Sequence, residues 1–228
     1  MKFLKQPIQQ AIPAITNTIV DQLRESKTVL WLVCGGSNIS AQVTIMSNIQ
    51  SQAPEYVKNL IILPMDERYG EAGHADSNYR QMCEAGFKPG DASWADVLAQ
   101  NVPLAETVEY YGTCIENAFS NADFVIGTFG MGADGHTAGV LPHSPALSET
   151  AASVVGYTTP GFTRMTMTPT WLIRCDVSFV LSYGAEKAPA LEDLREHSLS
   201  LNDMPAGLHY DIPNATIYND HIGDEVTQ

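Results

Sequence analysis

Short apolar runs that stop at glycine or at charged residues alternate along this chain with longer segments of helical periodicity. Four such runs occupy residues 29–34, 60–63, 123–129 and 177–183. Over residues 8–23, isoleucine and leucine recur at spacings of three and four, which predicts one face of a helix. Uniformly apolar strands that alternate with helices are typical of a parallel sheet covered on both faces. The chain is therefore predicted to form a doubly wound, mostly parallel, Rossmann-like α/β fold.

The remaining patterns complete this outline. Further helices are predicted near residues 39–49, 111–119 and 185–197, and further strands at 162–168 and 215–218. Thr168-Pro169 has the pattern of an N-cap followed by proline in the first helical turn, and Asp76-Ser77-Asn78 that of another N-cap. Residues 84–103 are rich in Gly, Pro, Ala and Asp and are expected to form a long surface loop. Because no repeat or linker interrupts the pattern, residues 1–228 are expected to form one domain.

Charge and hydropathy exclude several classes of function. The chain has 26 acidic and 12 basic residues, for a formal net charge of −14. A nucleic-acid-binding protein needs a basic face, so this class is excluded. No apolar run approaches the roughly 18 residues of a membrane helix, and the N-terminus lacks a secretory signal pattern, so a cytoplasmic location is expected. An anionic substrate would be repelled by the overall field, and its site must be built locally from N–H groups and a few cations.

The four cysteines, Cys34, Cys83, Cys114 and Cys175, are far apart and form no CxxC pair. They are interpreted as buried thiols in a reducing compartment. Their spacing indicates neither a metal site nor a disulfide.

Polar clusters follow four of the predicted strands directly. They are Gly35-Gly36-Ser37, Asp66-Glu67-Arg68, Gly130 to His136, and Gly184-Ala185-Glu186-Lys187. In an open parallel sheet, ligands bind outside the carboxyl ends of the strands. The four clusters are therefore expected to border one crevice.

Each cluster taken alone also has a structural interpretation. A glycine pair after a strand usually marks a tight turn, although the helix that Gly35 and Gly36 open offers unpaired N–H groups to an anion. Arg68 can belong to a surface turn held by ion pairs or can donate to a phosphate. Lys187 lies in a first helical turn, where the dipole disfavours a cation unless an anion is near.

The segment from Gly130 to His136 is the most informative. Its three glycines, Gly130, Gly132 and Gly135, can leave backbone N–H groups free to bind an oxyanion or a phosphate. His136 is a base that can work near neutral pH. Asp134 can either orient the His136 ring or hold the loop by accepting backbone hydrogen bonds, and the sequence leaves both roles open.

Taken together, these motifs resemble the 6-phosphogluconolactonase family, which belongs to one superfamily with the glucosamine-6-phosphate deaminases. The resemblance rests on the motifs at 35–37, 66–68, 76–79, 130–138, 141–142, 164–166 and 184–188, which occur in the order of that family. It implies hydrolysis of 6-phospho-D-glucono-1,5-lactone in the oxidative pentose phosphate pathway, without a cofactor. The substrate would be a small sugar-phosphate lactone, and the oligomeric state stays open.

The resemblance also implies a role for each site residue. His136 would activate water, supported by Asp134, and Arg68 and Lys187 would anchor the phosphate and lactone oxygens. The remaining predicted binding residues are Gly35, Gly36 and Ser37 of the phosphate loop, Asp66 in the pocket wall, Gly130 and Gly132, and Arg164 as a further contact.

The chain departs from the family pattern at two places. Asn38-Ile39 replaces a usual Thr-Pro after the loop serine, and Asn38 is expected to serve as an N-cap. Gly139-Val140-Leu141-Pro142 replaces Ser-Leu-Phe-Pro. Glucosamine-6-phosphate deaminases, the nearest alternative, place a glutamate shortly after the histidine, whereas here no carboxylate follows His136 until Glu149. A non-catalytic sugar-phosphate sensor is the alternative from another class.

Overall fold

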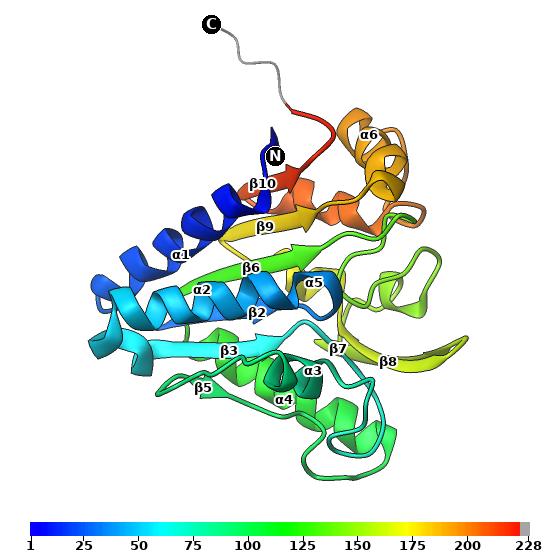
Figure 1. Cartoon of the computed structure of the whole chain (residues 1–228). Coiled ribbons are helices and arrows are strands. Elements are labelled where there is room, and N and C mark those ends of the chain that lie inside the picture. The colour runs from blue at the N-terminus through cyan, green and yellow to red at the C-terminus, as the bar shows by residue number, and fades with distance from the viewer. Residues whose placement is uncertain (224–228) are drawn as a thin grey trace, which may run out of the picture.

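The computed structural model describes residues 1–223 and has the mostly parallel α/β fold that the sequence predicts (Figure 1). Seven strands form one sheet in the order β1-β10-β9-β6-β2-β3-β5, and every neighbouring pair is parallel. These strands are β1 (Lys2–Lys5), β2 (Val29–Val33), β3 (Leu60–Pro64), β5 (Ser93–Trp94), β6 (Phe124–Gly130), β9 (Val177–Ser182) and β10 (Asn214–Asn219). The central strand β2 is apolar throughout because both of its faces are covered.

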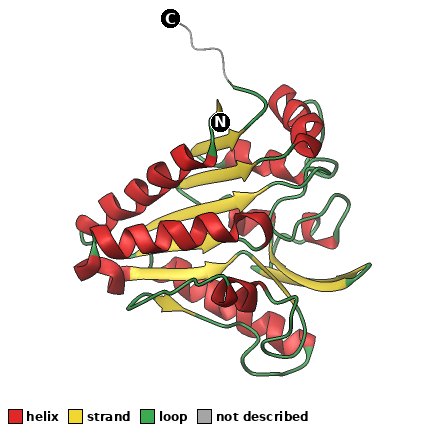
Figure 2. Cartoon of the chain, in the orientation of Figure 1, coloured by secondary structure: helices red, strands yellow, loops and turns green. Residues whose placement is uncertain are grey.

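Side chains of β2 alternate between two apolar cores, one on each face of the sheet. Leu30 and Leu32 point into one core, and Val29, Trp31 and Val33 into the other. The second core is covered by α1 (Ile8–Arg24) and α2 (Ile39–Gln52), and the first by α4 (Leu104–Asn121), α5 (Pro169–Leu172) and α6 (Ala188–Glu196). Figure 2 shows helices on both sides of the sheet, as the doubly wound prediction requires.

A second, antiparallel sheet has the strand order β4-β8-β7. It consists of β4 (Asp66–Arg68), β8 (Phe162–Met167) and β7 (Val154–Thr159), and it lies beyond the carboxyl ends of the main sheet (Figure 1). The predicted strand at residues 162–168 is thus confirmed, but it pairs in this sheet rather than in the parallel one. Strand β4 was not predicted, because three consecutive charged residues do not resemble a strand.

Several boundaries differ from the predictions. Residues 84–103 are not a plain surface loop: they contain β5, and Phe87, Val97 and Leu98 are buried. The Phe87 ring packs edge-on against Trp94, with 4.6 Å between ring centroids. Phe87 and Trp94 thereby join the apolar core that α1 and α2 cover.

Two of the three predicted N-caps, at Ser77 and Thr168, have different outcomes. Ser77 caps α3 (Asn78–Glu84), since its Oγ accepts the Arg80 N–H at 3.1 Å. Thr168 occupies the N-cap position before α5, but its hydroxyl donates to the Ala152 carbonyl at 2.9 Å instead of capping.

The predicted helix at 185–197 divides into a 3-10 turn, Ala185–Lys187, and α6. The four cysteines are free, but only Cys34 and Cys175 are buried, and Cys83 is exposed. The prediction of buried thiols is therefore wrong for Cys83, and Cys114 is only partly buried. Over residues 1–223, no helix has both the length and the apolar character needed to cross a membrane.

Candidate active site

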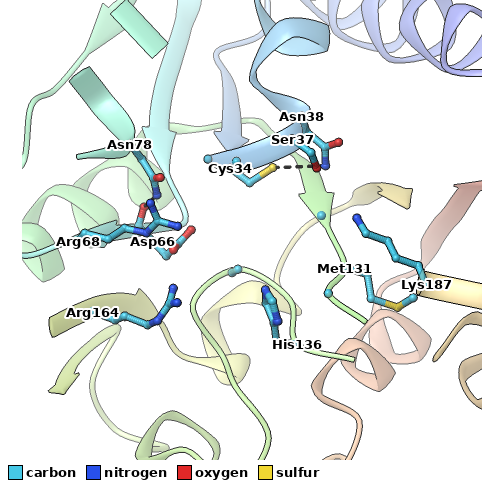
Figure 3. Close-up of a pocket in the computed structure, with 15 residues that line it drawn as sticks. Cys34, Ser37, Asn38, Asp66, Arg68, Asn78, Met131, His136, Arg164 and Lys187 are labelled. Carbon is cyan, nitrogen blue, oxygen red and sulfur yellow. Dashed lines mark hydrogen bonds between the residues drawn. The ribbon is translucent and has the colours of Figure 1, made fainter. Parts of the chain in front are cut away.

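The predicted clusters converge on one cavity of about 300 Å³, where β2, β6 and β9 end and the second sheet begins (Figure 3). Every predicted site residue except Asp134 lines this cavity. The lining residues are Cys34, Gly35, Gly36, Ser37, Asn38, Asp66, Arg68, Asn78, Gly130, Met131, Gly132, His136, Ala138, Arg164 and Lys187. The crevice that the sequence predicts at the strand ends therefore exists.

Asp134 lies behind His136 and fixes its ring. Oδ1 of Asp134 is 2.5 Å from Nδ1 of His136 and also accepts the His136 backbone N–H at 3.2 Å. Because an ionised carboxylate only accepts hydrogen bonds, Nδ1 must carry the ring proton. Nε2 then has a lone pair, and within residues 1–223 no protein group is hydrogen-bonded to it. His136 therefore presents a basic nitrogen, and its side chain is 35% exposed.

The electrostatics of Asp134 agree with this arrangement. Partial burial raises the pKa of Asp134, but the charge of His136 and the hydrogen bonds that it donates outweigh burial, so the pKa lies below its ordinary value. Asp134 stays ionised near neutral pH and can hold the Nδ1 proton. Both roles that the sequence left open for Asp134, orienting the ring and holding the loop, are present in its hydrogen bonds.

The loop around His136 is tightly closed on itself. The Gly132 N–H donates to the His136 carbonyl at 2.9 Å, and the Gly135 N–H donates to the Gly132 carbonyl at 3.1 Å. A Cβ on Gly132 would lie 2.2 Å from Nδ1 of His136, so the ring needs glycine there. The N–H groups of Gly132 and Gly135 are thus used inside the loop, as is that of His136, so the expectation of free N–H groups is wrong for these two glycines.

The second sheet contributes a pair of arginines. Arg68 on β4 is in register with Arg164 on β8, so two cations lie directly opposite each other. Both guanidinium carbons lie over the Phe162 ring, 5.3 and 5.6 Å from its centroid. Among residues 1–223, the only hydrogen bond from either guanidinium to the protein runs from Arg68 Nη1 to the Asp76 carbonyl, at 3.2 Å.

These arginines lack the partners that buried cations normally have. Within residues 1–223, no carboxylate oxygen lies within 4.0 Å of either guanidinium, and Nε of both Arg68 and Arg164 is buried without a hydrogen-bond partner. Like charges opposite each other on paired strands destabilise a sheet. An anionic group in the cavity would remove this cost and satisfy the free donors.

Asp66 is the carboxylate of this wall and is only 4% exposed. Burial raises its pKa above the ordinary value, although the charges of Arg68, Arg164 and His136 and a hydrogen bond from Asn78 act in the opposite direction. Asp66 is the only carboxylate among the cavity-lining residues.

Glu67, which sequence reasoning did not single out, organises the same wall from behind. It is fully buried, and its carboxylate accepts the N–H groups of Arg68 at 2.8 Å, Asn78 at 2.6 Å and Tyr79 at 2.9 Å, and the Ser77 hydroxyl at 3.1 Å. Residues 66–68 are therefore not the surface ion-paired turn that the sequence analysis considered. Glu67 ties β4 to the start of α3 and so fixes Arg68 and Asn78 at the cavity.

The opposite wall is made by the glycine loop and Lys187. A Cβ on Gly35 would lie 1.9 Å from Oδ1 of Asn78, so the two walls meet closely at this glycine. Gly36, Ser37 and Asn38 form a 3-10 turn whose first N–H groups have no partner inside the turn. Lys187 directly precedes α6, and within residues 1–223 it forms no ion pair. These groups offer a second set of donors at the other end of the cavity (Figure 3).

Asn38 does not act as the N-cap that the sequence predicts. Its side chain caps no helical N–H group. Instead, Nδ2 is 3.1 Å from the Leu181 carbonyl and 3.3 Å from the Phe129 carbonyl. Asn38 thereby joins the carboxyl ends of β9 and β6, a task that only the folded sheet makes possible.

Sequence reasoning also missed Cys34, Asn78, Met131 and Ala138 as lining residues. Asn78 could have been suspected from its place in the 76–79 motif, but it was interpreted as part of an N-cap. Burial and the charge of Asp66 raise the pKa of the Cys34 thiol to about 12, so this cysteine is a neutral lining residue. Within residues 1–223, no group of His, Cys, Asp and Glu side chains is placed to hold a metal ion.

Comparison with known proteins identifies the family. The family described as glucosamine-6-phosphate isomerases/6-phosphogluconolactonase matches residues 4–217. The chain belongs to this family. The 6-phosphogluconolactonase of Borreliella burgdorferi is 26% identical over 203 residues, which cover 85% of this chain and 84% of that protein.

Solved structures of the family share the fold without separating its two activities. The 6-phosphogluconolactonase of Trypanosoma brucei superposes with a TM-score of 0.77 at 18% identity, covering 99% of this chain and 98% of that one. A structure described as a monomeric glucosamine-6-phosphate deaminase superposes with a TM-score of 0.76, also at 18% identity, covering 96% of this chain and 97% of that one. The side chains of the cavity must therefore decide between the activities.

Proposed function

We propose that this chain is a 6-phosphogluconolactonase, which hydrolyses 6-phospho-D-glucono-1,5-lactone to 6-phosphogluconate in the oxidative pentose phosphate pathway. The observation that carries the proposal is the convergence of an Asp134-held His136 with Arg68, Arg164 and Lys187 on one cavity. Lactone hydrolysis needs a base, donors for a developing oxyanion and an anchor for the phosphate. Each of these has a candidate in the cavity.

His136 acts as the general base. Nε2 takes a proton from a water molecule as the water oxygen forms a bond to the lactone carbonyl carbon, and the carbonyl electron pair moves onto its oxygen. When that pair returns, the bond to the ring oxygen breaks, and the ring oxygen takes the proton back from Nε2. Asp134 stabilises the transient imidazolium through Nδ1–H, because its low pKa keeps it ionised.

The two walls of the cavity divide the substrate between them. Arg68 and Arg164 have unpartnered Nε groups beside His136, and these donors suit the oxyanion and the other lactone oxygens. Lys187, Ser37 and the first N–H groups of the Gly36–Asn38 turn suit the phosphate, since an ammonium and a helical N-terminus both favour an anion. The phosphate does not change during the reaction, so its binding serves to position the lactone.

The deaminase alternative has weaker support. Ring opening in that reaction uses a carboxylate placed shortly after the histidine, and the first carboxylate after His136, Glu149, is not among the cavity-lining residues. Oε1 of Glu149 instead accepts the backbone N–H groups of Ala151 and Ala152, at 2.8 and 3.0 Å. A non-catalytic sensor would have no need of the His136–Asp134 pair.

We also propose that the protein is located in the cytosol and that residues 1–228 act as one domain. Its only proposed partner is the sugar-phosphate lactone.

Turnover of freshly prepared lactone tests the function. Purified protein should release acid from 6-phospho-D-glucono-1,5-lactone well above the spontaneous rate, with no ammonia from glucosamine 6-phosphate. Ammonia release without lactonase activity would establish the deaminase instead. Stabilisation against heat by 6-phosphogluconate, with turnover of neither substrate, would establish the sensor.

A further inference from the structure

A second histidine lies beneath the catalytic loop and has no role in the proposed reaction. His209 is fully buried, in the 3-10 turn Pro205–Asp211, and its ring packs edge-on against Phe129 with 4.6 Å between ring centroids. Its two nitrogens each face a hydroxyl: Nε2 is 3.4 Å from Thr137 Oγ1, and Nδ1 is 3.2 Å from Ser178 Oγ. Thr137 directly follows His136 in the chain.

The hydrogen-bond directions in this cluster follow from the donors available. Thr137 Oγ1 donates its single proton to the Gly130 carbonyl at 2.9 Å, so towards His209 it can only accept. Nε2 of His209 must then carry the ring proton, and Nδ1 must accept from the Ser178 hydroxyl. A directed chain therefore runs from Ser178 on β9 through His209 and Thr137 to Gly130, at the base of the catalytic loop.

Burial keeps this chain in one protonation state. Removal from water lowers the pKa of His209 to about 3, so the imidazole stays neutral at any pH at which the enzyme would work. Within residues 1–223, the ring is in contact with the hydroxyls of Thr137 and Ser178 and with the Phe129 ring, and it forms no ion pair.

The turn that carries His209 also holds the loop at a second point. The Ala206 N–H donates to the Gly135 carbonyl at 2.9 Å, and a Cβ on Gly135 would lie 2.3 Å from Sδ of Met204. Residues on both sides of His136 are therefore attached to this one segment. The His136 side chain lines the cavity, and among residues 1–223 its ring is hydrogen-bonded to Asp134 alone.

We propose that His209 is a positioning residue for the reaction, which sets the catalytic loop through its hydrogen bond to Thr137 and so holds Nε2 of His136 at the substrate. This inference rests on the proposed lactonase function. It assigns the residue to placement of the base and not to proton transfer, because the chain ends on the Gly130 carbonyl and does not reach His136.

Three variants test the proposal. His209→Phe keeps an aromatic ring but removes both hydrogen bonds, and Thr137→Val removes the acceptor. His209→Gln keeps an amide N–H donor near the place of Nε2. We expect His209→Phe and Thr137→Val each to lower kcat about 10–100-fold, since a misplacement of about 1 Å can cost about 10²-fold. KM should change less than about twofold, because the phosphate anchors are untouched.

The combination of variants separates positioning from plain stability. The double variant should lose no more than the worse single one, because both break the same chain, and His209→Gln should recover most of kcat. Trp31→Phe serves as the matched control: it removes a buried hydrogen bond of 2.9 Å to Thr128 in the other apolar core. It should lower the melting temperature but leave kcat unchanged. A full kcat in His209→Phe, with a lowered melting temperature, would overturn the proposal.

A measurement of amide hydrogen exchange, which needs no turnover, tests the anchoring of the loop independently of the reaction. Amide hydrogen exchange of Gly132 and Gly135, whose N–H groups close the loop, should accelerate in His209→Phe but not in Trp31→Phe. If the wild type hydrolyses no lactone, the proposed function fails, and selective loop opening would still establish the anchoring. Unchanged exchange in both variants would refute the anchoring even in an active enzyme.

Discussion

The two walls of the cavity are built on different principles. At the ends of the parallel strands, loops and helical turns present His136, Lys187 and backbone N–H groups. On the antiparallel sheet, paired strands hold Arg68 and Arg164 in register, with Asp66 beside them. In the first wall, hydrogen bonds within and beneath a loop fix the position of the base, whereas in the second wall the pairing of two strands fixes the charges. In the proposed reaction, the first wall therefore supplies the base and the anchors for the phosphate, and the second wall supplies donors for the charge that develops on the lactone oxygen.

The second wall contains buried polar groups without partners, which lower the stability of the fold. Arg68 Nε and Arg164 Nε are buried without acceptors among residues 1–223, and Asp66 is held with a raised pKa. Unsatisfied buried polar groups destabilise a fold and are concentrated at functional sites. In the wall formed by the strand-end loops, side chains instead approach the backbone so closely that Gly132 and Gly35 leave no room for a Cβ, which would lie 2.2 Å from Nδ1 of His136 and 1.9 Å from Oδ1 of Asn78.

The largest effect is expected from His136→Asn, in the first wall. Asparagine keeps the size and polarity of the side chain but offers no basic nitrogen, so kcat should fall about 10²–10⁴-fold with little change in KM. The measurement is the initial rate of acid release after subtraction of spontaneous hydrolysis. His143→Asn is the matched control, because His143 is exposed and bonds to Asn202 outside the cavity. Loss of activity in His143→Asn but not in His136→Asn would mean that the assignment of His136 as the base is wrong.

A smaller effect is expected from Arg164→Ala, in the second wall. Loss of one donor to a developing oxyanion typically costs about 10²–10³-fold in rate, and kcat/KM should fall by that amount with the phosphorylated and with the unphosphorylated lactone alike. Arg174→Ala, which changes an arginine that lies over Trp171 and Phe119, is the control. If Arg164→Ala lowers kcat/KM with the phosphorylated lactone alone, Arg164 binds the phosphate. The phosphate is then not bound by the first wall alone.

Lys187→Ala should act on binding. A hydrogen bond to a charged group contributes about 1.5–3 kcal/mol, so KM for the phosphorylated lactone should rise about 10–100-fold while kcat stays within a few-fold. Unphosphorylated glucono-1,5-lactone is the control substrate, for which the variant and the wild type should have nearly equal kcat/KM. Equal damage with both lactones would contradict the assignment of Lys187 to the phosphate.

The smallest effect concerns stability, at Asp66. Because its pKa is raised in the folded protein, the folded state binds this proton more tightly than the unfolded chain, and the free energy of unfolding falls as pH rises above the ordinary pKa of about 3.9. Asp66→Asn cannot titrate there, so its melting temperature relative to wild type should increase between acidic and neutral pH. One pKa unit corresponds to about 1.4 kcal/mol, or a few degrees for a chain of this size. If the difference in melting temperature between Asp66→Asn and wild type does not change with pH, the pKa of Asp66 is not raised in the folded protein.

Much of the fold and of the site could be predicted because it depends on local patterns. Apolar runs such as residues 29–34 and 177–183 became central strands, and helical periodicity gave α1 and α4. Glycine and charged clusters at strand ends located the cavity, since strand ends of a parallel sheet meet at one edge. His136 and its Asp134 partner could be paired because they are two residues apart.

Tertiary structure decided what depends on partners far away in the chain. The sequence predicted Asn38 as an N-cap, but its amide reaches the Phe129 and Leu181 carbonyls, more than 90 and 140 residues away. Glu67 and His209 carry no local pattern that distinguishes them from surface residues. Each is defined by donors or acceptors that only the folded chain brings within hydrogen-bond distance. The amino-acid order alone thus determined which elements form and where their polar ends meet. The second sheet, the facing arginines and the buried supports of the loop depended on long-range packing, because pairing and burial are properties of contacts and not of sequence neighbours.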